Sequence, residues 1–408
     1  MKVSGIVVEY NPFHNGHLYH INKTKECTNS DLIIAVMSGN FNQRGIPSII
    51  DKWTKTKTAL DNGVDIVLEL PSVYSLSSAE FFSFGAISLL NSLGVVDNVC
   101  FGSESGNIDF LDEVAQLLVS EPPYFKELLK EQLNKGLAFP KARAVALNHY
   151  LEKNSDYPLD ELNNQLNSSN NILGIEYIKS LKKLNSAIKP YTIQRQGGAY
   201  NSTTLDSNFS SATSIRNTLK TSASLNDLKK HMPLNVVEQF LRLKNNGYTF
   251  PFDYMMYDHI RYKAMMDYKN MFEFLPDVSE GLHNKMLSTI KECTTYDECI
   301  TKVKSKRYAY TRLSRILCQY FLNFYDYDIA TLRKKPCPYA RLLGFNENGK
   351  SILKHIKNNS SIPIYSKLPK EINETLAIDL KATEGYSILN PSIRHNEDLL
   401  TSPIMLCK

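Results

Sequence analysis

The sequence predicts an α/β fold in which an N-terminal doubly wound parallel sheet is followed by a mainly helical C-terminal domain. Short β-branched apolar runs alternate with helical segments through about the first hundred residues. After about residue 226 the pattern becomes mainly helical. The chain has 408 residues, which is enough for two or three domains with a sizeable core.

Each element of the predicted N-terminal sheet has its own signal. Runs rich in Val and Ile indicate strands, and Gly63, Pro71 and Gly94 indicate where segments stop. Strands are expected at 3–8, 32–37, 65–70 and 95–101, and helices at 18–26, 51–62 and 77–93. Ligands of such sheets lie beyond the carboxyl ends of the strands. We therefore expect the polar strand exits at 9–17, 38–40 and 102–104 to meet in one crevice.

After residue 107, prolines, glycines and Asn- and Ser-rich stretches indicate where one segment ends and the next begins. Residues 107–153 are expected to be a helical insertion with proline breaks, and the Asn- and Ser-rich segment 154–171 is expected to be a loop. The expected elements that follow are a helix at 172–183, a strand at 191–194, a loop opened by Gly197 and Gly198, a helix led by 210–216, a linker at 221–226, helices to about 325, and a tail of short helices and strands. This predicts a nucleotidyltransferase-like domain at 1–222, with its insertion at about 107–170, and a helical domain at 223–408.

Composition argues against several classes of protein. No run reaches the ~18 apolar residues that a membrane span needs. The N-terminus enters a strand after one lysine, unlike a signal peptide. The seven cysteines form no C-x-x-C pattern, which favours reduced thiols and argues against a disulfide frame or a zinc site. We expect a cytoplasmic protein without membrane contact, whose net charge of +5 is compatible with RNA as a partner.

The first strand leads into the pattern His14-Asn15-Gly16-His17. A helix N-terminus offers N–H groups and a positive dipole end to phosphate, and Gly16 lets the backbone come close because it has no Cβ. His14 and His17 could then donate hydrogen bonds to the oxygens of an α-phosphate, where negative charge builds up during the reaction. Such donors suit attack on the α-phosphorus of ATP, with pyrophosphate as the leaving group. The alternative is a helix cap or a surface pair. Metal ligation together with His20 is not expected, because no carboxylate or thiolate completes a shell.

A second phosphate-binding pattern, G-x-x-x-x-G-K-S, occurs at residues 344–351. Its context is unfavourable. The preceding residues 339–343 are not a clear buried strand, and Glu347 would place a carboxylate inside the phosphate cradle. We expect a turn ahead of a helix at 352–356 instead.

Basic residues gather in the C-terminal half, at Lys302, Lys304, Lys306, Arg307, Arg312 and Arg315, with Tyr308 and Tyr310 among them, and again at 333–335. Basic side chains contact phosphates and aromatic rings stack on bases, so the stretch is a candidate RNA surface. The alternative is a solvated helix face with two core tyrosines.

Several blocks in order resemble the bacterial tRNA(Met) cytidine acetate ligases, which belong to the wider HxGH nucleotidyltransferase-like group with a Rossmann-type sheet. The first block is GIVVEYNPFHNGH at 5–17. The others lie at 37–45, 51–54, 69–71, 78–80, 101–104, 170–177, 194–195 and 211–216, and the match continues more weakly at 306–308. One departure is Lys55, where the family often has arginine. A phosphate or RNA role for this position is not carried over, because lysine lacks the bidentate contact of arginine.

The resemblance implies an ATP site in which His14 and His17 are catalytic. Val7 to Tyr10 would line the adenosine side, Ser214 and Arg216 could hold the outer phosphates, and Asn171 competes with Asn170 for the nucleotide. Mg²⁺ would be held mostly by phosphates and water. The implied ATP-binding residues are Val7, Val8, Glu9, Tyr10, Asn11, Pro12, Phe13, His14, Asn15, Gly16, His17, Leu18, Tyr19, His20, Gly102, Asn170 and Arg195.

The resemblance also implies a two-step ligase. Acetate attacks ATP to give acetyl-adenylate and pyrophosphate, and N4 of the wobble cytidine of elongator tRNA(Met) then takes the acetyl group, which gives N4-acetylcytidine and AMP. Adenylation is needed because acetate acylates poorly until its oxygen becomes a good leaving group. Two alternatives stay open. One is an adenylyltransferase acting on a phosphorylated small molecule, and the other is a non-catalytic RNA-binding protein with ATP as a structural ligand. No DNA partner is expected, and the oligomeric state is not predicted.

Overall fold

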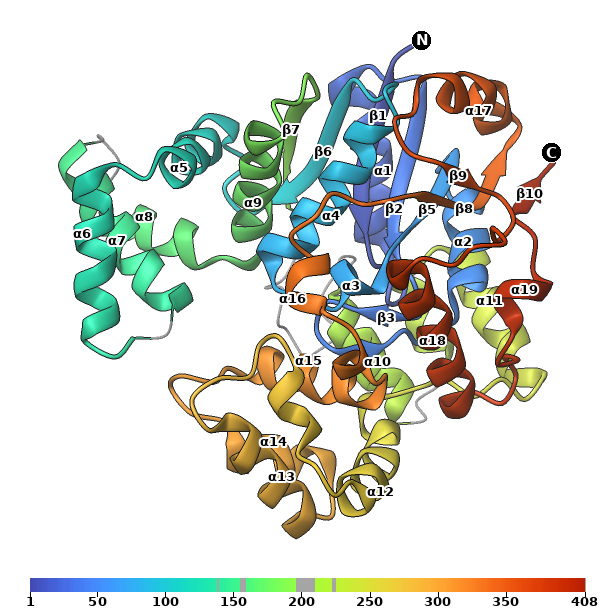
Figure 1. The fold of residues 1–408 in the computed structure, drawn as a ribbon. Helices are drawn as coiled ribbons and strands as arrows, with labels where there is room; N and C mark the ends of the chain where they lie inside the picture. The colour runs from blue at the N-terminus through green and yellow to red at the C-terminus, as the bar shows by residue number, and fades with distance from the viewer. Residues whose placement is uncertain (138, 155–158, 196–209, 222–224, 408) are drawn as a thin grey trace.

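A mostly parallel sheet forms the centre of the protein (Figure 1). The computed structural model describes residues 1–137, 139–154, 159–195, 210–221 and 225–407. Within these residues the sheet has eight strands in the order β10-β8-β5-β2-β1-β6-β7, with β9 beside β8. This confirms the predicted α/β class. The loop expected at Gly197 and Gly198 and residues 222–224 of the expected linker lie outside the described residues.

Five strands of the sheet are parallel, so that their carboxyl ends share one edge. They are β1 (Val3–Val8), β2 (Leu32–Ser38), β5 (Ile66–Leu70), β6 (Asn98–Ser103) and β7 (Lys189–Gln194). β2 and β5 are buried on both faces, as their continuous apolar sequences predict.

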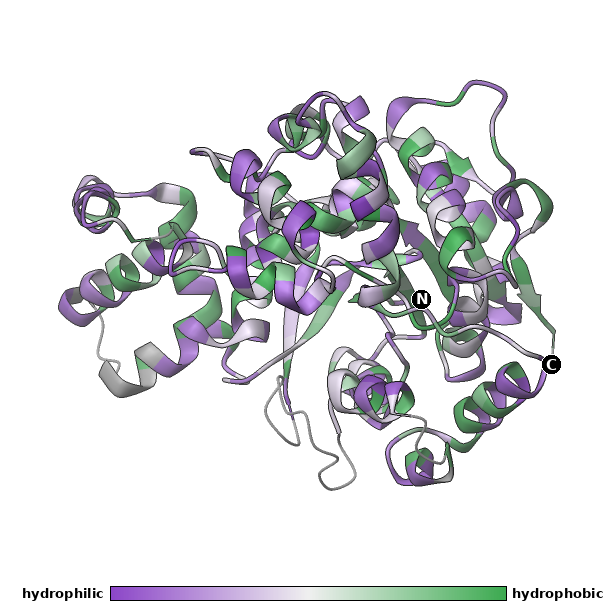
Figure 2. Cartoon of the chain, turned by 90° about the horizontal axis from the view of Figure 1, so that it is seen from below, coloured by the Kyte–Doolittle hydropathy of each residue, from purple (hydrophilic) through white to green (hydrophobic). Residues whose placement is uncertain are grey.

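Alternate residues of the strands enter two hydrophobic cores, one on each face of the sheet. Ile34 and Val36 join the core that contains the helix α4 (Ala79–Ser92). Ile33 and Ala35 join the other core, with side chains of α1 (Asn15–Thr28), α2 (Lys52–Asp61) and α11 (Leu234–Asn245). In Figure 2 hydrophobic residues gather on the central strands. The sheet is thus covered on both faces, as a doubly wound fold requires.

A helical lobe extends to one side of the sheet (Figure 1). It contains α5 (Ile108–Ser120), α6 (Pro123–Asn134), α7 (Phe139–Asn154) and α8 (Leu159–Asn167), and it leads into α9 (Ser169–Lys183). The helical expectation for 107–153 is confirmed, but the loop expected at 154–171 is wrong for its described part. Leu162 and Leu166, four residues apart, are buried in the core and stabilise a helix in a segment that is otherwise polar.

The C-terminal half begins with a second helical group and ends in the central sheet. α12 (Tyr257–Met266), α13 (Leu282–Glu292), α14 (Tyr296–Val303) and α15 (Tyr310–Phe321) lie beyond the carboxyl edge of the sheet (Figure 1). β8 (Ala340–Asn346) then pairs antiparallel with β5, and β9 (Ile364–Tyr365) and β10 (Ile404–Leu406) pair with β8. The division at residue 222 stays a prediction, and the tail contributes three strands to the sheet of the N-terminal half.

The remaining elements connect these groups. They are β3 (Phe41–Asn42), β4 (Ile46–Pro47), α3 (Ser72–Ser75), α10 (Ala212–Lys220), α16 (Ile329–Leu332), α17 (Glu347–Asn359), α18 (Glu374–Leu389), α19 (Glu397–Leu400) and the 3₁₀ helices η1 (Leu225–Lys230), η2 (Asp253–Met256), η3 (Met271–Phe274) and η4 (Phe324–Asp326). None of the described helices combines the length and the apolar character that crossing a membrane demands.

The segment 344–351 caps a helix at the edge of the sheet opposite to the carboxyl ends of β1 and β2. The expectation that no buried strand precedes it is wrong, because β8 is a buried strand. Asn346 Oδ1 accepts a hydrogen bond from Gly349 N at 2.9 Å, and a Cβ on Gly349 would lie 2.2 Å from Asp65 O. The backbone at Gly349 is thus packed against Asp65, and its N–H is already used by the cap, so a phosphate does not fit there. The expected turn before a helix is confirmed, although the helix begins at Glu347 rather than at 352.

Candidate nucleotide-binding site

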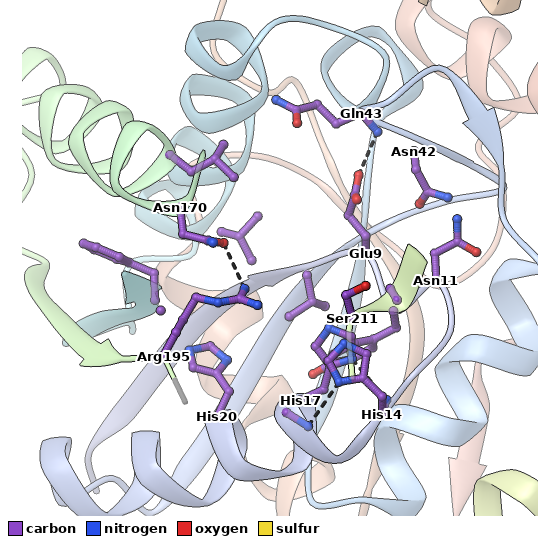
Figure 3. Close-up of a pocket in the computed structure, with 18 of the residues that line it drawn as sticks. Glu9, Asn11, His14, His17, His20, Asn42, Gln43, Asn170, Arg195 and Ser211 are labelled. Atoms are coloured by element: carbon purple, nitrogen blue, oxygen red, sulfur yellow. Dashed lines mark hydrogen bonds between the residues drawn. The ribbon is translucent and has the colours of Figure 1, made fainter. Parts of the chain in front are cut away.

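A cavity of about 210 Å³ opens at the carboxyl edge of the sheet, where β1, β6 and β7 end (Figure 3). It lies where the polar strand exits at 9–17 and 102–104 were expected to meet, but the third expected exit, at 38–40, does not contribute to its wall. The predicted residues in its wall are Val7, Val8, Glu9, Tyr10, Asn11, His14, Gly16, His17, Tyr19, His20, Gly102, Asn170 and Arg195, and Arg216 joins them.

Four of the predicted ATP-binding residues lie outside this wall, namely Pro12, Phe13, Asn15 and Leu18. Phe13 is buried in the core, with its ring 4.7 Å from that of Tyr10. Asn15 Nδ2 donates to Lys230 O at 2.9 Å, away from the cavity. Leu18 packs against the core under α1. Ser214 is also buried outside the wall, where its backbone N–H and hydroxyl pair with Ser211.

The chain turns sharply between β1 and α1. Tyr10 has a φ of 49°, a left-handed conformation that is unfavourable for a bulky residue. Its buried ring meets those of Phe13 and His17 at 4.7 and 4.9 Å, edge to face. This aromatic packing holds the turn that delivers His14 to the start of α1.

His14 and His17 themselves form the cap of α1. Gly16 N donates to Nδ1 of His14 at 3.1 Å, and His14 N donates to Nδ1 of His17 at 3.2 Å. This reciprocal arrangement is a capping box built from two imidazoles. The rings stack with centroids 3.7 Å apart (Figure 3). From the sequence alone, a helix cap and a nucleotide site are alternative roles of the two histidines. In the structure the histidines form the cap and also line the cavity.

The cap also determines where each ring carries its proton. Because Nδ1 accepts a hydrogen bond in both rings, the neutral imidazoles carry their protons on Nε2. Burial lowers the pKa of His14 to about 3, with a contribution from Arg195, and burial and the charges of His14, His20 and Arg195 hold the pKa of His17 well below its usual value. Near neutral pH the cavity therefore presents two neutral N–H donors.

The histidines make the stability of the ligand-free protein depend on pH. Burial also lowers the pKa of His20 to about 4. Below pH ~6.5 the unfolded chain binds protons that the folded protein does not, so the free energy of unfolding decreases by about 1.4 kcal/mol per pH unit and histidine. We expect the melting temperature to fall between pH ~7 and pH ~5, and to fall less in His20→Asn. An identical decrease in both proteins would contradict these pKa values.

Asn170 and Arg195 line the cavity on the same side, and their side chains point toward each other (Figure 3). Arg195 Nη1 donates to Asn170 Oδ1 at 3.2 Å. The carboxylate of Glu104 accepts hydrogen bonds from Asn170 Nδ2 at 2.7 Å and from Asn171 N at 2.9 Å, in the first turn of α9. The buried Asn171 accepts in return from Glu104 N at 2.8 Å. Asn171 thus positions the loop, whereas Asn170 lines the cavity.

The strand pair β3–β4 contributes residues that were not predicted, among them Asn42, Gln43 and Arg44. Gln43 N donates to Glu9 Oε1 at 2.7 Å, which ties this hairpin to the exit of β1. Gly45, with a φ of 74°, provides the turn. The strand exit at 38–40 was expected to reach the crevice, but the residues that line the cavity here, Asn42 to Arg44, follow that exit and had no signal of their own.

Lys55 does not face the cavity. It is fully buried, and its Nζ donates to Ser38 O and Gly39 O at 2.7 Å and to Ser48 Oγ at 2.9 Å. Burial lowers its pKa to about 7. Its hydrogen bonds hold the exit of β2, so a contact with phosphate is not its role.

Much of the basic stretch 302–315 is engaged within the protein. Arg312 donates to Asp277 O at 2.7 Å, and Lys302 pairs with Glu298 at 3.1 Å. Arg315 is half-buried and donates to Gln43 O at 3.4 Å. Tyr310 is 39% exposed. An RNA-binding role for the whole stretch stays a prediction.

Comparisons with known proteins agree over the full length of the chain. The model of the HIGH Nucleotidyl Transferase family matches residues 1–399. The tRNA(Met) cytidine acetate ligases of Clostridium novyi (strain NT) and Clostridium kluyveri (strain NBRC 12016) are each 53% identical, with 100% of both chains covered. Thermotoga maritima TmcAL, in its apo form I, is 35% identical with a TM-score of 0.92, and TmcAL bound with alpha-thio ATP is 36% identical with a TM-score of 0.91; each covers 100% of both chains. The chain therefore belongs to the HIGH nucleotidyl transferase family and, within it, to the tRNA(Met) cytidine acetate ligases.

Proposed function

We propose that this protein activates acetate with ATP and transfers the acetyl group to N4 of the wobble cytidine of elongator tRNA(Met). The observation that carries this proposal is the pair of neutral Nε2–H donors beside a helix N-terminus, in a chain 53% identical to tRNA(Met) cytidine acetate ligases. The structural relative that binds alpha-thio ATP supports ATP as the nucleotide.

In the first step an oxygen of acetate attacks the α-phosphorus, the bond to the β-phosphate breaks, and pyrophosphate leaves. Negative charge increases on the non-bridging oxygens of the α-phosphate. His14 and His17 would donate hydrogen bonds to these oxygens, and their cap bonds fix both rings before the substrate arrives. A neutral imidazole can serve as such a donor. Val7 to Tyr10 and Gly102 would contact the adenosine, with Asn170 beside it, and Arg195 would contact a phosphate.

Mg²⁺ is proposed to accompany ATP. Among the described residues no group of three His, Cys, Asp or Glu side chains could hold a metal ion by itself. The ion would accordingly be bound by phosphate oxygens and water. We assign no catalytic step to it.

The test is mass spectrometry of elongator tRNA(Met) after incubation with the protein, ATP and acetate. We expect a mass increase of one acetyl group on the wobble cytidine, dependent on both small substrates. ATP turnover with a phosphorylated metabolite but not with acetate would favour an adenylyltransferase. Binding of tRNA without any turnover of ATP would indicate an RNA-binding protein.

Gly16→Ala tests the position of His14 without removing a functional group. A Cβ at Gly16 would lie 2.9 Å from Cε1 of His14, so the ring must move. Displacement of a catalytic group by about 1 Å can lower a rate about 100-fold, whereas alanine favours the helix. We expect acetate-dependent pyrophosphate release to fall by this order, with an unchanged or higher melting temperature. Full activity would show that the position of the ring is unimportant.

A further inference from the structure

A second cavity, of about 350 Å³, adjoins the nucleotide cavity. The two share Arg44, Ile46, Thr213 and Arg216 in their walls. A group in the second cavity can therefore approach the phosphate side of the first across this shared wall. We call the second cavity the acceptor pocket.

The wall of the acceptor pocket combines aromatic rings with charges of both signs. Phe252 and Tyr310 supply rings, and Lys220 supplies a cation. Phe252 is itself stacked on Tyr254, with centroids 5.9 Å apart and planes at 8°. Unpaired nucleobases bind by stacking on aromatic side chains and by hydrogen bonds to their edges. The lining thus suits a planar, polar ring.

Asp253 is one of two carboxylates in this wall. It begins η2, where its Oδ1 accepts a hydrogen bond from Tyr254 N at 3.0 Å, which orients the carboxylate. It is half-buried, whereas Asp297, the other acidic residue of the wall, is exposed. Burial raises the pKa of Asp253 despite the nearby charges of Lys220 and Arg216. A carboxylate in this environment is a better proton acceptor than one in water.

We infer that the acceptor pocket takes the cytosine ring of the tRNA, and that Asp253 removes the proton from its N4 amine. The inference rests on the proposed function. N4 attacks the carbonyl carbon of acetyl-adenylate and an N–C bond forms. The C–O bond to AMP breaks, AMP leaves with the electron pair, and the N4 proton passes to Asp253.

The contact between Asp253 and the N4 amine also explains why the pocket would accept cytosine and reject uracil. Cytosine presents an amine at C4, which donates to a carboxylate, whereas uracil presents an oxygen there. The oxygen of uracil has a partial negative charge and no proton to donate. It would therefore be repelled by the carboxylate of Asp253. Lys220, a cation of this wall whose Nζ lies 4.8 Å from the ring centre of Tyr254, would donate to the acceptor atoms N3 and O2 on the adjoining edge of cytosine. The pocket therefore selects the ring that can be acetylated.

Asp253→Asn separates the two steps of the reaction. Asparagine keeps an oxygen for the Tyr254 N–H but cannot accept the N4 proton. We expect acetylation of tRNA in a single turnover to fall 100-fold or more, while acetate-dependent pyrophosphate release without tRNA continues. Asp258→Asn, on the exposed side of α12, removes the same charge and should acetylate tRNA like the unaltered protein.

The outcomes separate this inference from the function on which it rests. If the unaltered protein releases no pyrophosphate with acetate, the proposed function fails. If it acetylates tRNA and Asp253→Asn does so within about twofold, the role of Asp253 is overturned and the function stands. An equal loss of both steps in Asp253→Asn would assign the residue to folding and would also overturn the inference. A ring replacement adds a second readout: Tyr310→Leu should weaken tRNA acetylation more than Tyr310→Phe, which keeps the aromatic face.

Discussion

Replacing either His14 or His17 with asparagine is expected to lower the rate of acetyl-adenylate formation by about 10²- to 10³-fold, the loss typical for one donor to a developing oxyanion. Asparagine is informative because its Oδ1 can take the place of Nδ1 in the cap. Asparagine is also a favoured N-cap residue, so α1 should stay folded in His14→Asn. What disappears is the Nε2–H donor. The measurement is acetate-dependent release of pyrophosphate from ATP, with the melting temperature followed in the same preparations.

His355→Asn is the matched control, because His355 is exposed on α17, outside the cavity wall. It should release pyrophosphate at the rate of the unaltered protein. A double variant of His14 and His17 that keeps more than about a tenth of the rate would refute the assignment of both rings. A loss of rate accompanied by unfolding would show that their main role is to cap the helix.

Lys52→Met is expected to give the largest loss of stability. Lys52 is fully buried, with Nζ 2.8 Å from Glu69 Oε1 and 2.8 Å from Asp398 Oδ1. Arg341 completes the cluster, 3.0 Å from Asp398 Oδ1. Methionine fills the space but leaves two buried carboxylates with one cation. Removing one partner of a buried ion pair lowers the free energy of unfolding by about 3–5 kcal/mol. Chemical denaturation measures this loss.

The control lies on the same helix. Lys57 pairs with Asp61 at 2.6 Å, but its side chain is 48% exposed. Lys57→Met should change the free energy of unfolding by less than about 1 kcal/mol, as exposed pairs do. If Lys52→Met and Lys57→Met cost the same, the buried cluster does not stabilise the contact between α2, β5 and the tail of the chain.

The N-terminal sheet could be predicted because its strands are continuous Val- and Ile-rich runs that end at polar residues. Ile34 and Ile33, for example, face opposite hydrophobic cores. Because both faces of this strand are buried, its sequence is one continuous apolar run that is easily recognised as a strand. The histidine pair could be predicted because short-range geometry at one helix start determines both the cap and the donors. These features depend on residues close together in the sequence.

The features that could not be predicted depend on distant segments. β8 pairs with β5 antiparallel, Glu69 opposite Arg341, and no local signal in either strand selects that partner. Arg341 and Asp398 are of residue types that are rarely buried, so the sequence alone places them on the surface. The acceptor pocket likewise combines the β3–β4 hairpin, α10 and η2, whose residues acquire a shared role only when the chain is folded.

A structure of the complex with a non-hydrolysable ATP analogue tests the central claim most directly. The account predicts that Nε2 of His14 and Nε2 of His17 each lie about 2.7–3.2 Å from an oxygen of the α-phosphate, with the cap bonds of both Nδ1 atoms retained. A nucleotide bound beside Lys350, or an α-phosphate more than about 4 Å from both Nε2 atoms, would contradict it.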